Sequence, residues 1–423
     1  MTESKGISSA VVAVGDELLI GETLDGNGSW LSKKLTNLGT PVTGRWVTGD
    51  DPVAIKQTIM TALEKSELVI VTGGLGPTID DLTRPSVAEL FGLKLIVNQS
   101  LVDQLRSRFS TIGYEMLPVR NLVQAEVPEG AIIIPNCEGT APGLIIENEG
   151  KSVVLLPGVP HEMQSMFDRS VTEYINKRFQ SRLDPILQRT FNTSGIPESL
   201  LAEELDKDIS RFPSDVSVAF LPGLQGVSLR LTAPFSGGQG LGSLDFCENI
   251  IETTLAPYCY SVGKKSIMDS LAECLLMDKK CFAVGESCTG GLISKHITDL
   301  PGSSRYFKGG IVAYDVATKS GVLGIDKSVI EEKGVVSEEV AALMAERITE
   351  VMKADFGIGL TGIAGPDGGT KDNPVGTICY AVAGHDQVIS FRKIFQGNRE
   401  SIRERAAQAA LFSLFRILTN RQD

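Results

Sequence analysis

The chain has 423 residues, a length that predicts two or three domains, and its 42% hydrophobic and 22% charged residues are typical of a soluble globular protein. Its formal net charge of -12 argues against broad nucleic-acid binding, and no apolar stretch approaches the roughly eighteen residues of a membrane helix. The seven cysteines include no CxxC pair, which argues against a disulfide framework or a structural zinc site. We therefore expect a cytoplasmic protein of several domains that binds neither membranes nor nucleic acids, and whose N-terminal apolar run is a strand rather than a signal peptide.

Residues 1–168 form the first predicted block, in which apolar strand-like runs alternate with helical patterns. This alternation predicts a parallel, doubly wound α/β sheet. Ligands of such sheets bind beyond the carboxyl ends of the strands, so the loops that follow the strands should share one edge. The predicted strands are SSAVVAV (8–14), PVTGRWV (41–47) and SELVIVT (66–72), and the loops after them are GDELLIG (15–21), TGDD (48–51) and GGLGPTIDD (73–81).

The loops at this edge carry the residue types of a metal-dependent phosphate site. Hard cations such as Mg²⁺ bind carboxylates together with substrate phosphates, and glycines let the backbone approach a phosphate closely. Each acidic or hydroxyl residue could instead cap a following helix, but the combination of a glycine-rich loop with paired aspartates favours a site. The candidates are Asp16, Glu17, Asp50, Asp51, Asp80 and Asp81, with Gly73, Gly74 and Gly76, and the hydroxyls of Thr72, Thr78 and Thr83.

Residues 169–262 form a smaller α+β block in which no residue looks catalytic. Helices are predicted over 196–209 and near 246–256, and two strands between them form a hairpin around PGLQG (222–226). GLQG has the letters of the GxxG loop with which KH domains grip nucleotides, but no basic residues accompany it. We therefore expect this segment to be a hairpin turn.

Residues 263–423 return to a mixed α/β pattern, and a short glycine-rich segment marks the candidate site of this block. The predicted strand CFAVGE (281–286) runs into GESCTGG (285–291), directly before a helix. A tight strand-to-helix turn would account for the glycines. Alternatively, the turn brings Ser287 or its own N–H groups against a substrate.

A nucleophilic serine in this block needs a base, and histidine is a poor candidate for it. Of the three histidines in the chain, His296 lies within the helix that follows GESCTGG, and His385 lies in a predicted turn. Lysine can serve as the base when burial depresses its pKa, which makes Lys319, shortly after Tyr314, the candidate. Taken alone, Tyr314 could be a half-buried strand residue, Lys319 part of a solvated helix face, and Cys288 a small buried hydrophobe.

Four segments of the first block resemble the N-terminal domain of the CinA (competence-damage-inducible) family, a domain that is similar in turn to molybdopterin-binding domains. The segments are VGDELLIG (14–21), TGGLGPTIDDLT (72–83), NCEGTAPG (136–143) and LPGVPHEM (156–163). The resemblance implies an ADP-ribose pyrophosphatase that forms AMP and ribose 5-phosphate. It also implies a divalent metal ion of the Mg or Co type, with K⁺ as a candidate further ion.

The same resemblance implies roles for individual residues of the first block. The metal ligands would be Asp16, Asp80, Asp81 and Glu162, and the substrate contacts would be Gly73, Gly74, Gly76, Thr78 and Asn27. A divalent ion at this place would neutralise the diphosphate and lower the pKa of an attacking water. One departure lies in LDGN (24–27), where Gly26 stands in place of the threonine expected before Asn27.

Five segments of the third block resemble the C-terminal domain of the same family, which also occurs alone as nicotinamide mononucleotide amidase. They are GESCTGG (285–291), PGSSRYFKGGIVAYDVATK (301–319), LTGIAGPDGGT (360–370), PVGT (374–377) and GNRE (397–400). Such an enzyme releases the carboxamide nitrogen as ammonia and leaves nicotinic acid mononucleotide. The resemblance implies no cofactor for this reaction.

This second resemblance also implies an active site. Its residues would be Ser287, Ser304, Tyr314, Lys319 and Thr361 for catalysis, Arg399 for the phosphate, and Gly290 and Gly291 for the substrate. Either serine could be the nucleophile, and we favour Ser304 with Lys319, leaving the GESCTGG turn as a cradle that orients the substrate. Asp315 stands where an asparagine is expected, and its charge could weaken phosphate binding or perturb Lys319.

The resemblance covers essentially the whole chain, with residues 169–262 as a KH-like linker. It implies a homodimeric, bifunctional enzyme of pyridine-nucleotide salvage that acts on small nucleotides. In one alternative, the first block binds a pterin without catalysis, although its paired carboxylates disfavour a pure binder. In another, the chain is a scaffold in competence or DNA repair, but its acidic charge argues against direct DNA contact.

Overall fold

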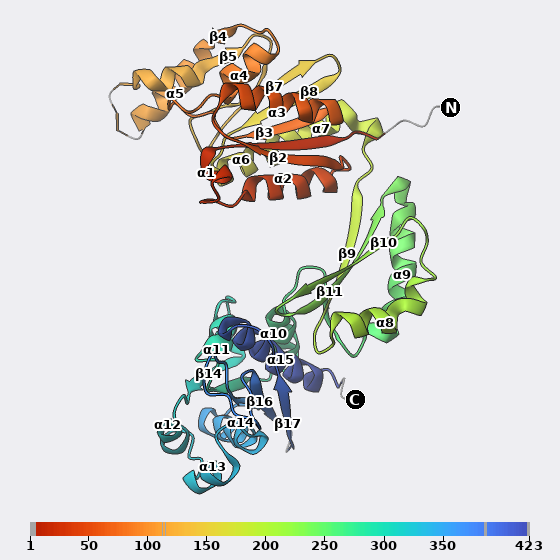
Figure 1. The fold of residues 1–423 in the computed structure, drawn as a ribbon, viewed down its shortest axis with the longest axis vertical. Coiled ribbons are helices and arrows are strands. Elements are labelled where there is room, and N and C mark those ends of the chain that lie inside the picture. The colour runs from red at the N-terminus through yellow and green to blue at the C-terminus, as the bar shows by residue number, and fades with distance from the viewer. Residues whose placement is uncertain (1–5, 112, 115, 385–386, 421–423) are drawn as a thin grey trace. The chain divides into compact units, whose positions relative to one another are not determined.

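The computed structural model describes residues 6–111, 113–114, 116–384 and 387–420 (Figure 1). The chain divides into two compact units, Met1–Leu187 with Pro234–Gln239, and Gln188–Ala233 with Gly240–Asp423. The predicted second and third blocks therefore lie largely within one unit, and the domain boundaries after residues 168 and 262 stay predictions. Among the described residues, no helix has both the length and the apolarity that crossing a membrane requires.

The first unit contains the expected doubly wound sheet. Its strand order is β2-β1-β3-β8-β7-β6, and β1, β2, β3 and β8 run parallel. β1 contributes residues to two core clusters, one on each face of the sheet, so both faces of the strand are buried. The strands are β1 (Ser9–Val14), β2 (Val42–Thr48), β3 (Leu68–Thr72), β6 (Ile132–Ile134), β7 (Gly143–Asn148) and β8 (Lys151–Leu156), with a separate pair, β4 (Leu95–Val97) and β5 (Glu126–Pro128).

Helices cover both faces of this sheet. One core cluster includes residues of α3, α4 and α5, and the other includes residues of α2, α6 and α7. Because β1, β2 and β3 are parallel, the three loops that follow them lie at one edge, as predicted. The helices are α1 (Asp16–Leu19), α2 (Gly26–Asn37), α3 (Pro52–Lys65), α4 (Thr83–Leu90), α5 (Gln99–Thr111), α6 (Pro160–Met166) and α7 (Thr172–Phe179).

The second unit begins with a four-stranded sheet of order β10-β11-β9-β12. β10 and β11 form the predicted hairpin, in which Gly223 pairs with Gly226, so GLQG is its turn. The sequence predicted neither β9 nor β12. The elements are β9 (Ile186–Thr193), α8 (Glu198–Ile209), β10 (Ser217–Gly223), β11 (Gly226–Pro234), α9 (Gln239–Leu255) and β12 (Cys259–Val262).

The rest of this unit is a mixed sheet of order β14-β13-β15-β16-β17. β14, β13 and β15 are parallel, whereas β16 and β17 continue the sheet antiparallel. The strands are β13 (Phe282–Glu286), β14 (Phe307–Val312), β15 (Phe356–Gly362), β16 (Thr377–Gly384) and β17 (Gln387–Ile394), and the helices are α10 (Ile267–Met277), α11 (Leu292–Thr298), α12 (Val316–Gly321), α13 (Lys327–Lys333), α14 (Glu338–Met352) and α15 (Arg399–Leu418).

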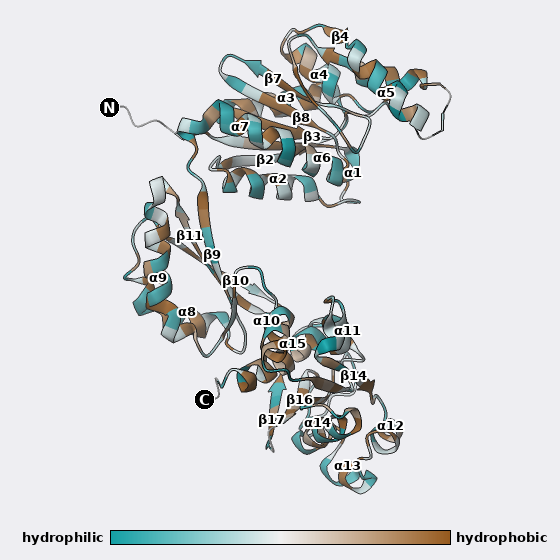
Figure 2. Ribbon diagram, turned by 180° about the vertical axis from the view of Figure 1, so that it is seen from behind, coloured by the Kyte–Doolittle hydropathy of each residue, from teal (hydrophilic) through white to brown (hydrophobic). Residues whose placement is uncertain are grey.

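Two layers of helices enclose this mixed sheet. α10, α11 and α15 share one core cluster with the sheet, and α13 and α14 share another. Helices such as α2 and α9 show both hydrophilic and hydrophobic residues in Figure 2, as expected for helices with one face on a sheet. α14 packs very close to β15. A Cβ added to Gly359 would come within 2.2 Å of the Ala341 carbonyl oxygen, so only glycine fits at this position. The mixed α/β class predicted for this block is confirmed.

Candidate functional site

The GESCTGG turn is organised by the carboxylate of Glu286, the last residue of β13. This fully buried side chain accepts hydrogen bonds from the N–H groups of Gly291 (3.0 Å), Ile293 (3.1 Å) and Ser294 (2.9 Å), and from the Ser294 hydroxyl (2.7 Å). It therefore takes up the unpaired N–H groups at the start of α11. Gly290 and Gly291 adopt φ values of +59° and +90°, which L side chains rarely adopt.

We expected the backbone N–H groups of this turn to bind the substrate, but those of Gly290 and Gly291 already have partners within the protein. The Gly291 N–H donates to Glu286, and the Gly290 N–H donates to the Ser287 carbonyl at 3.0 Å. Both N–H groups are thus used inside the turn, one by the Glu286 carboxylate and the other by the Ser287 carbonyl. The glycines explain the chain reversal, while the side chain of Ser287 remains for the site.

Ser287 and Lys319 form the central contact of the site. The Lys319 side chain is completely buried, and its Nζ donates to the Ser287 Oγ at 3.0 Å, the Ala313 carbonyl at 2.7 Å and the Tyr314 carbonyl at 3.4 Å. Burial lowers the pKa of Lys319, and the Asp315 carboxylate acts more weakly in the opposite direction. A buried lysine with a depressed pKa beside a serine hydroxyl is the arrangement of a base with its nucleophile.

Ser304 does not lie with Lys319 in this chain, so the pairing that we favoured from sequence needs correction. Ser304 precedes β14, where the Tyr306 carbonyl accepts from the Phe282 N–H at 2.9 Å, whereas Lys319 follows β14. β14 has six residues and spans about 20 Å at roughly 3.3 Å per residue. The loops before and after one strand lie at opposite edges of its sheet, so β14 separates Ser304 from Lys319.

Tyr314, Arg399 and Thr361 lie at the same edge as Ser287. Arg399, the first residue of α15, donates from Nη2 to the Tyr314 hydroxyl at 3.0 Å and from Nη1 to the Gly365 carbonyl at 2.6 Å. The Thr361 hydroxyl is buried and donates to the Val335 carbonyl at 2.9 Å. Leu360 precedes Thr361 in β15, and its carbonyl accepts a hydrogen bond from the Ser287 N–H at 3.0 Å. Four of the five predicted catalytic residues therefore lie at the same edge of this sheet, at or after the ends of β13, β14 and β15.

Asp315 and Cys288 have roles that the sequence left open. The Asp315 carboxylate accepts from the Thr318 N–H at 2.7 Å and so caps α12, and hydrogen bonds from Thr318 lower its pKa. Its charge is therefore engaged at a helix start. Burial raises the pKa of the Cys288 thiol to about 12, which disfavours the reactive thiolate.

The histidine that follows the turn has a partner of its own. His296 pairs with Glu404 through Nε2 at 2.9 Å, and His385 lies outside the described residues. The site residue that sequence reasoning missed is Arg403, which donates from Nη2 to the Thr289 carbonyl and whose Nε has no hydrogen-bond partner among the described residues. No motif marked it, because α15 reaches the turn only through tertiary packing.

The first unit has a cavity of about 400 Å³ at the predicted ligand edge, lined by Glu17, Asp50, Asp80, Asp81, Glu162 and the glycine-rich loop. Asp16 and Asp50 form a reciprocal pair of hydrogen bonds. The Asp50 carboxylate accepts from the Asp16 N–H at 3.0 Å, and the Asp16 carboxylate accepts from the Asp50 N–H at 3.2 Å. Burial raises the pKa of Asp50, and the charges of Asp16, Glu17 and Asp80 contribute in the same direction.

Asp81 organises the glycine-rich loop from within. Its carboxylate accepts from the N–H groups of Gly76 (2.7 Å) and Thr78 (2.8 Å), and from the Thr78 hydroxyl. A hydrogen bond from Thr78 also lowers the pKa of exposed Asp80. At Gly73, where φ is +108°, an added Cβ would come within 2.2 Å of the Val14 carbonyl, so the loop needs glycine there.

Two further predicted residues, Asn27 and Gly74, hold the same edge together. Asn27 donates from Nδ2 to the Thr72 hydroxyl at 3.2 Å and to the Gly158 carbonyl at 2.7 Å, so it joins α2 to the ends of β3 and β8. Gly74 adopts φ +66° beside Thr83. Asn27 thus links three elements by hydrogen bonds, and Gly74 allows the close approach of Thr83.

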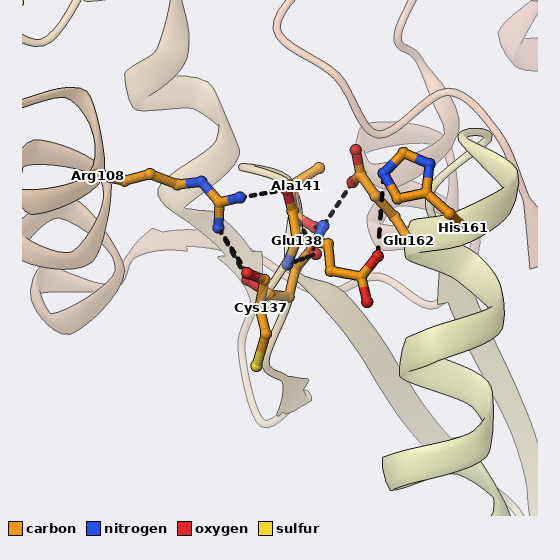
Figure 3. Close-up of polar contacts among 8 residues, drawn as sticks. Arg108, Cys137, Glu138, Ala141, His161 and Glu162 are labelled. Atoms are coloured by element: carbon orange, nitrogen blue, oxygen red, sulfur yellow. Dashed lines mark hydrogen bonds and ion pairs between the residues drawn. The ribbon is translucent and has the colours of Figure 1, made fainter. Parts of the chain in front are cut away.

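Glu162 faces the NCEGTAPG loop, as Figure 3 shows. The Asn136 amide donates to the Glu162 Oε2 at 2.7 Å and to the Ala141 carbonyl at 2.9 Å. From the other side, Arg108 donates to the carbonyls of Cys137, at 3.2 Å, and Glu138 (Figure 3). This loop is therefore held between α5 and α6.

The four predicted metal ligands do not converge on one point. Asp81 is occupied by its own loop, Asp16 by the backbone of Asp50, and Glu162 by Asn136. Within the described ranges, no group of three or more His, Cys, Asp or Glu side chains is arranged to hold a metal ion. The residues present thus do not fit a preformed metal centre, and the metal requirement stays a prediction.

Similar proteins extend over almost the whole chain. A "CinA-like protein" of Gemmatimonas aurantiaca is 40% identical over 96% of this chain and 95% of its own length. The chain belongs to the CinA family. Its residues 10–177 match the family model described as "Probable molybdopterin binding domain", 188–261 the damage-inducible protein CinA KH domain, and 264–418 the CinA C-terminal domain.

A second relative matches almost the whole chain, whereas a solved structure matches less than half of it. A protein of Caldicellulosiruptor saccharolyticus described as competence-damage inducible is 39% identical over 97% of this chain and 99% of its own. The crystal structure of the protein CinA from Thermoplasma acidophilum, whose title gives its function as unknown, is 34% identical and covers 42% of this chain and 99% of its own. The TM-score of this match is 0.38.

The role of Glu286 leads to a testable expectation. Glu286→Gln places an amide NH₂ group among N–H donors and should lower the local opening free energy of the turn by ~1–3 kcal/mol. Amide hydrogen exchange over residues 287–298 should then be roughly tenfold or more faster. Asp326→Asn is the control: Asp326 caps α13 through the Ser328 N–H, and asparagine caps equally well, so exchange there should hardly change. Unchanged exchange in the Glu286 variant would contradict the organising role of this carboxylate.

Proposed function

We propose that the second unit is an amidase that hydrolyses nicotinamide mononucleotide to nicotinic acid mononucleotide and ammonia. The observation that supports it best is the hydrogen bond between the buried Lys319 ammonium and the Ser287 hydroxyl. Lys319 has a lowered pKa, so its neutral form becomes accessible, and Arg399 lies at the same edge of the sheet. Membership of the CinA family agrees with this activity but does not by itself establish it.

In this proposal Ser287 is the nucleophile and Lys319 is its base. Neutral Lys319 accepts the hydroxyl proton as the Ser287 Oγ bonds to the carboxamide carbon, and the resulting ammonium then protonates the leaving nitrogen, which departs as ammonia. A water molecule, deprotonated in the same way, attacks the ester. The carboxylate product leaves and the Ser287 hydroxyl is restored.

Arg399 is suited to hold the phosphate of the substrate. A guanidinium has five N–H donors in a fixed fork, and the described contacts of Arg399 are with the Gly365 carbonyl and the Tyr314 hydroxyl. The remaining donors can bind a phosphate oxygen in a charge-assisted hydrogen bond. Tyr314, which is exposed, would orient this guanidinium next to Lys319.

Substitutions at the two serines and the lysine test these assignments. Ser287→Ala and Lys319→Met should each lower kcat for ammonia release by ~10²–10⁴-fold, and the double variant should be little worse, because the two act as one unit. Lys319→Arg should not restore activity, since guanidinium does not give up its proton at neutral pH. Ser304→Ala is the matched control and should keep near-normal kcat. An inactive Ser304→Ala variant beside an active Ser287→Ala variant would return the nucleophile to Ser304.

The lowered pKa of Lys319 predicts the pH dependence of this activity. Only neutral Lys319 can accept a proton, and its fraction increases with pH, so kcat should rise with pH through the Lys319 pKa. Because burial lowers this pKa, the rise should fall below the ordinary lysine value of 10.5. Steady-state kinetics over a pH series measures it. A limb at or above the ordinary lysine value would argue against a desolvated lysine as the base.

We infer a second activity, the hydrolysis of ADP-ribose to AMP and ribose 5-phosphate, for the first unit. The specific observation is the cavity of about 400 Å³, in which carboxylates surround a glycine-rich loop at the carboxyl ends of parallel strands. Asp50 lines this cavity and its pKa is raised by burial, so it is the carboxylate of the site that we assign to proton exchange. We derive no metal-dependent step, because the predicted ligands do not form a metal centre.

Two adjacent aspartates allow a controlled test of this second activity. Asp50→Asn should lower AMP formation from ADP-ribose, assayed with added Mg²⁺ or Co²⁺, by ~10²-fold or more. Asp51→Asn should have little effect, because Asp51 caps α3 through the Ala54 N–H and asparagine can do the same. Amidase activity should be unchanged in both variants. If the unsubstituted chain forms no AMP with either metal, the first unit is better described as a binding module, for which a pterin is the alternative ligand.

We propose small nucleotides as the substrates, a homodimer as the working form, the cytoplasm as its location, and no role in binding nucleic acids or membranes. The net charge of -12 supports the absence of nucleic-acid binding, as does the position of GLQG at a hairpin turn.

A further inference from the structure

The second unit contains a cavity that has no part in the proposed amidase reaction. It has a volume of about 480 Å³ and lies between the tip of the β10–β11 hairpin, the end of β17 and the middle of α15. Its lining contains none of the residues of the Ser287 site. The GLQG turn, for which the amidase has no use, forms one of its walls.

Two basic side chains line the cavity, and neither forms an ion pair with a carboxylate among the described residues. Lys393 lines it, and the Lys393 ammonium forms no hydrogen bond or ion pair within the described residues. Burial, followed by the nearby charge of Arg416, lowers the pKa of Lys393. Arg405 also lines the cavity, and its described contact is a donation from Nη1 to the Gln396 carbonyl at 2.6 Å rather than to a carboxylate. Glu198 is the acidic residue of the lining and is exposed.

Gln408 adds an unsatisfied polar group to the same wall. Its side chain is 5% exposed, and its amide nitrogen has no hydrogen-bond partner in the part of the chain that the structure describes. Buried amide groups without partners are rare because they lose their hydrogen bonds to water without replacement. The lining also contains apolar side chains, among them Phe395, Leu224 and Ile196.

We propose that this cavity binds a small organic anion. Its phosphate or carboxylate oxygens would lie among Lys393, Arg405 and the Gln408 amide, which together offer donors and positive charge. Its nonpolar part would lie against Phe395 and Leu224. A volume of about 480 Å³ suits a ligand of roughly mononucleotide size, and a few polar groups in an apolar cavity are the usual composition of such sites.

In this proposal the GLQG turn contributes to an anion site rather than to nucleic-acid binding. Gly226 adopts φ +136°, and an added Cβ would come within 2.0 Å of the Thr193 carbonyl, so the hairpin tip is packed tightly against β9. Leu224 and Gln225 at the turn line the cavity together with Arg405 and Gln408 of α15. A bound anion would therefore contact both the hairpin and the C-terminal helix.

Acetylation of lysines by an N-hydroxysuccinimide ester of acetic acid, read out by mass spectrometry of the full chain, tests the site directly. The probes are AMP, phthalate as an organic anion without phosphate, and inorganic phosphate. AMP and phthalate should slow acetylation of Lys393 in a saturable manner by about tenfold, because a paired ammonium is held in its charged, unreactive form. Lys308, exposed on β14, is the internal control and should react at an unchanged rate.

Two variants locate the effect. Arg405→Met and Gln408→Leu should each raise the probe concentration needed for half protection by roughly 10–100-fold, the loss expected for a hydrogen bond to a charged group. Gln408→Leu is close in size and removes an unsatisfied amide, so it should fold with an unchanged or higher Tm. The proposal is overturned if no probe protects Lys393, or if protection is unchanged in both variants. Equal protection by inorganic phosphate would overturn the assignment of an organic ligand.

Discussion

The burial of the Lys319 ammonium is the constraint on which the candidate active site depends. A charged group can leave water only if its hydrogen bonds are replaced, and here the replacements are the Ser287 hydroxyl and the carbonyls of Ala313 and Tyr314. These atoms come from the ends of β13 and β14, so the site exists only when the two strands are paired in this register. The same desolvation that makes burial costly also lowers the pKa of Lys319, which makes the lysine useful as a base.

The two units use the same device to shape a glycine-rich loop. In each, a carboxylate within the segment accepts hydrogen bonds from nearby backbone N–H groups: Glu286 from Gly291 and the start of α11, and Asp81 from Gly76 and Thr78. The glycines supply positive φ values, and the carboxylate replaces the external anion that such loops often bind. Acidic residues beside glycines are therefore not ligands by default, and in GESCTGG it is the Ser287 hydroxyl that contacts Lys319.

Family membership and site geometry contribute different parts of the functional argument. Similarity over almost the full length places the chain among CinA proteins. The distinction between Asp50 and Asp51, or between Ser287 and Ser304, comes from geometry alone. Asp51 and Asp50 are neighbours in sequence, yet one caps a helix and the other lies in a cavity among carboxylates. Such neighbours make matched controls for each other.

The sequence by itself determined the doubly wound first sheet, the GLQG hairpin turn and the mixed α/β third block, because these follow from local periodicity and turn chemistry. It also contained the motifs of the family and most residues of the candidate site. Only the tertiary structure decided that Lys319 meets Ser287 rather than Ser304, since strand direction places one serine at each end of the sheet. Arg403 beside the turn, and Lys393, Arg405 and Gln408 around a cavity, likewise depend on how α15 packs, and contacts between segments so far apart leave no local pattern to read.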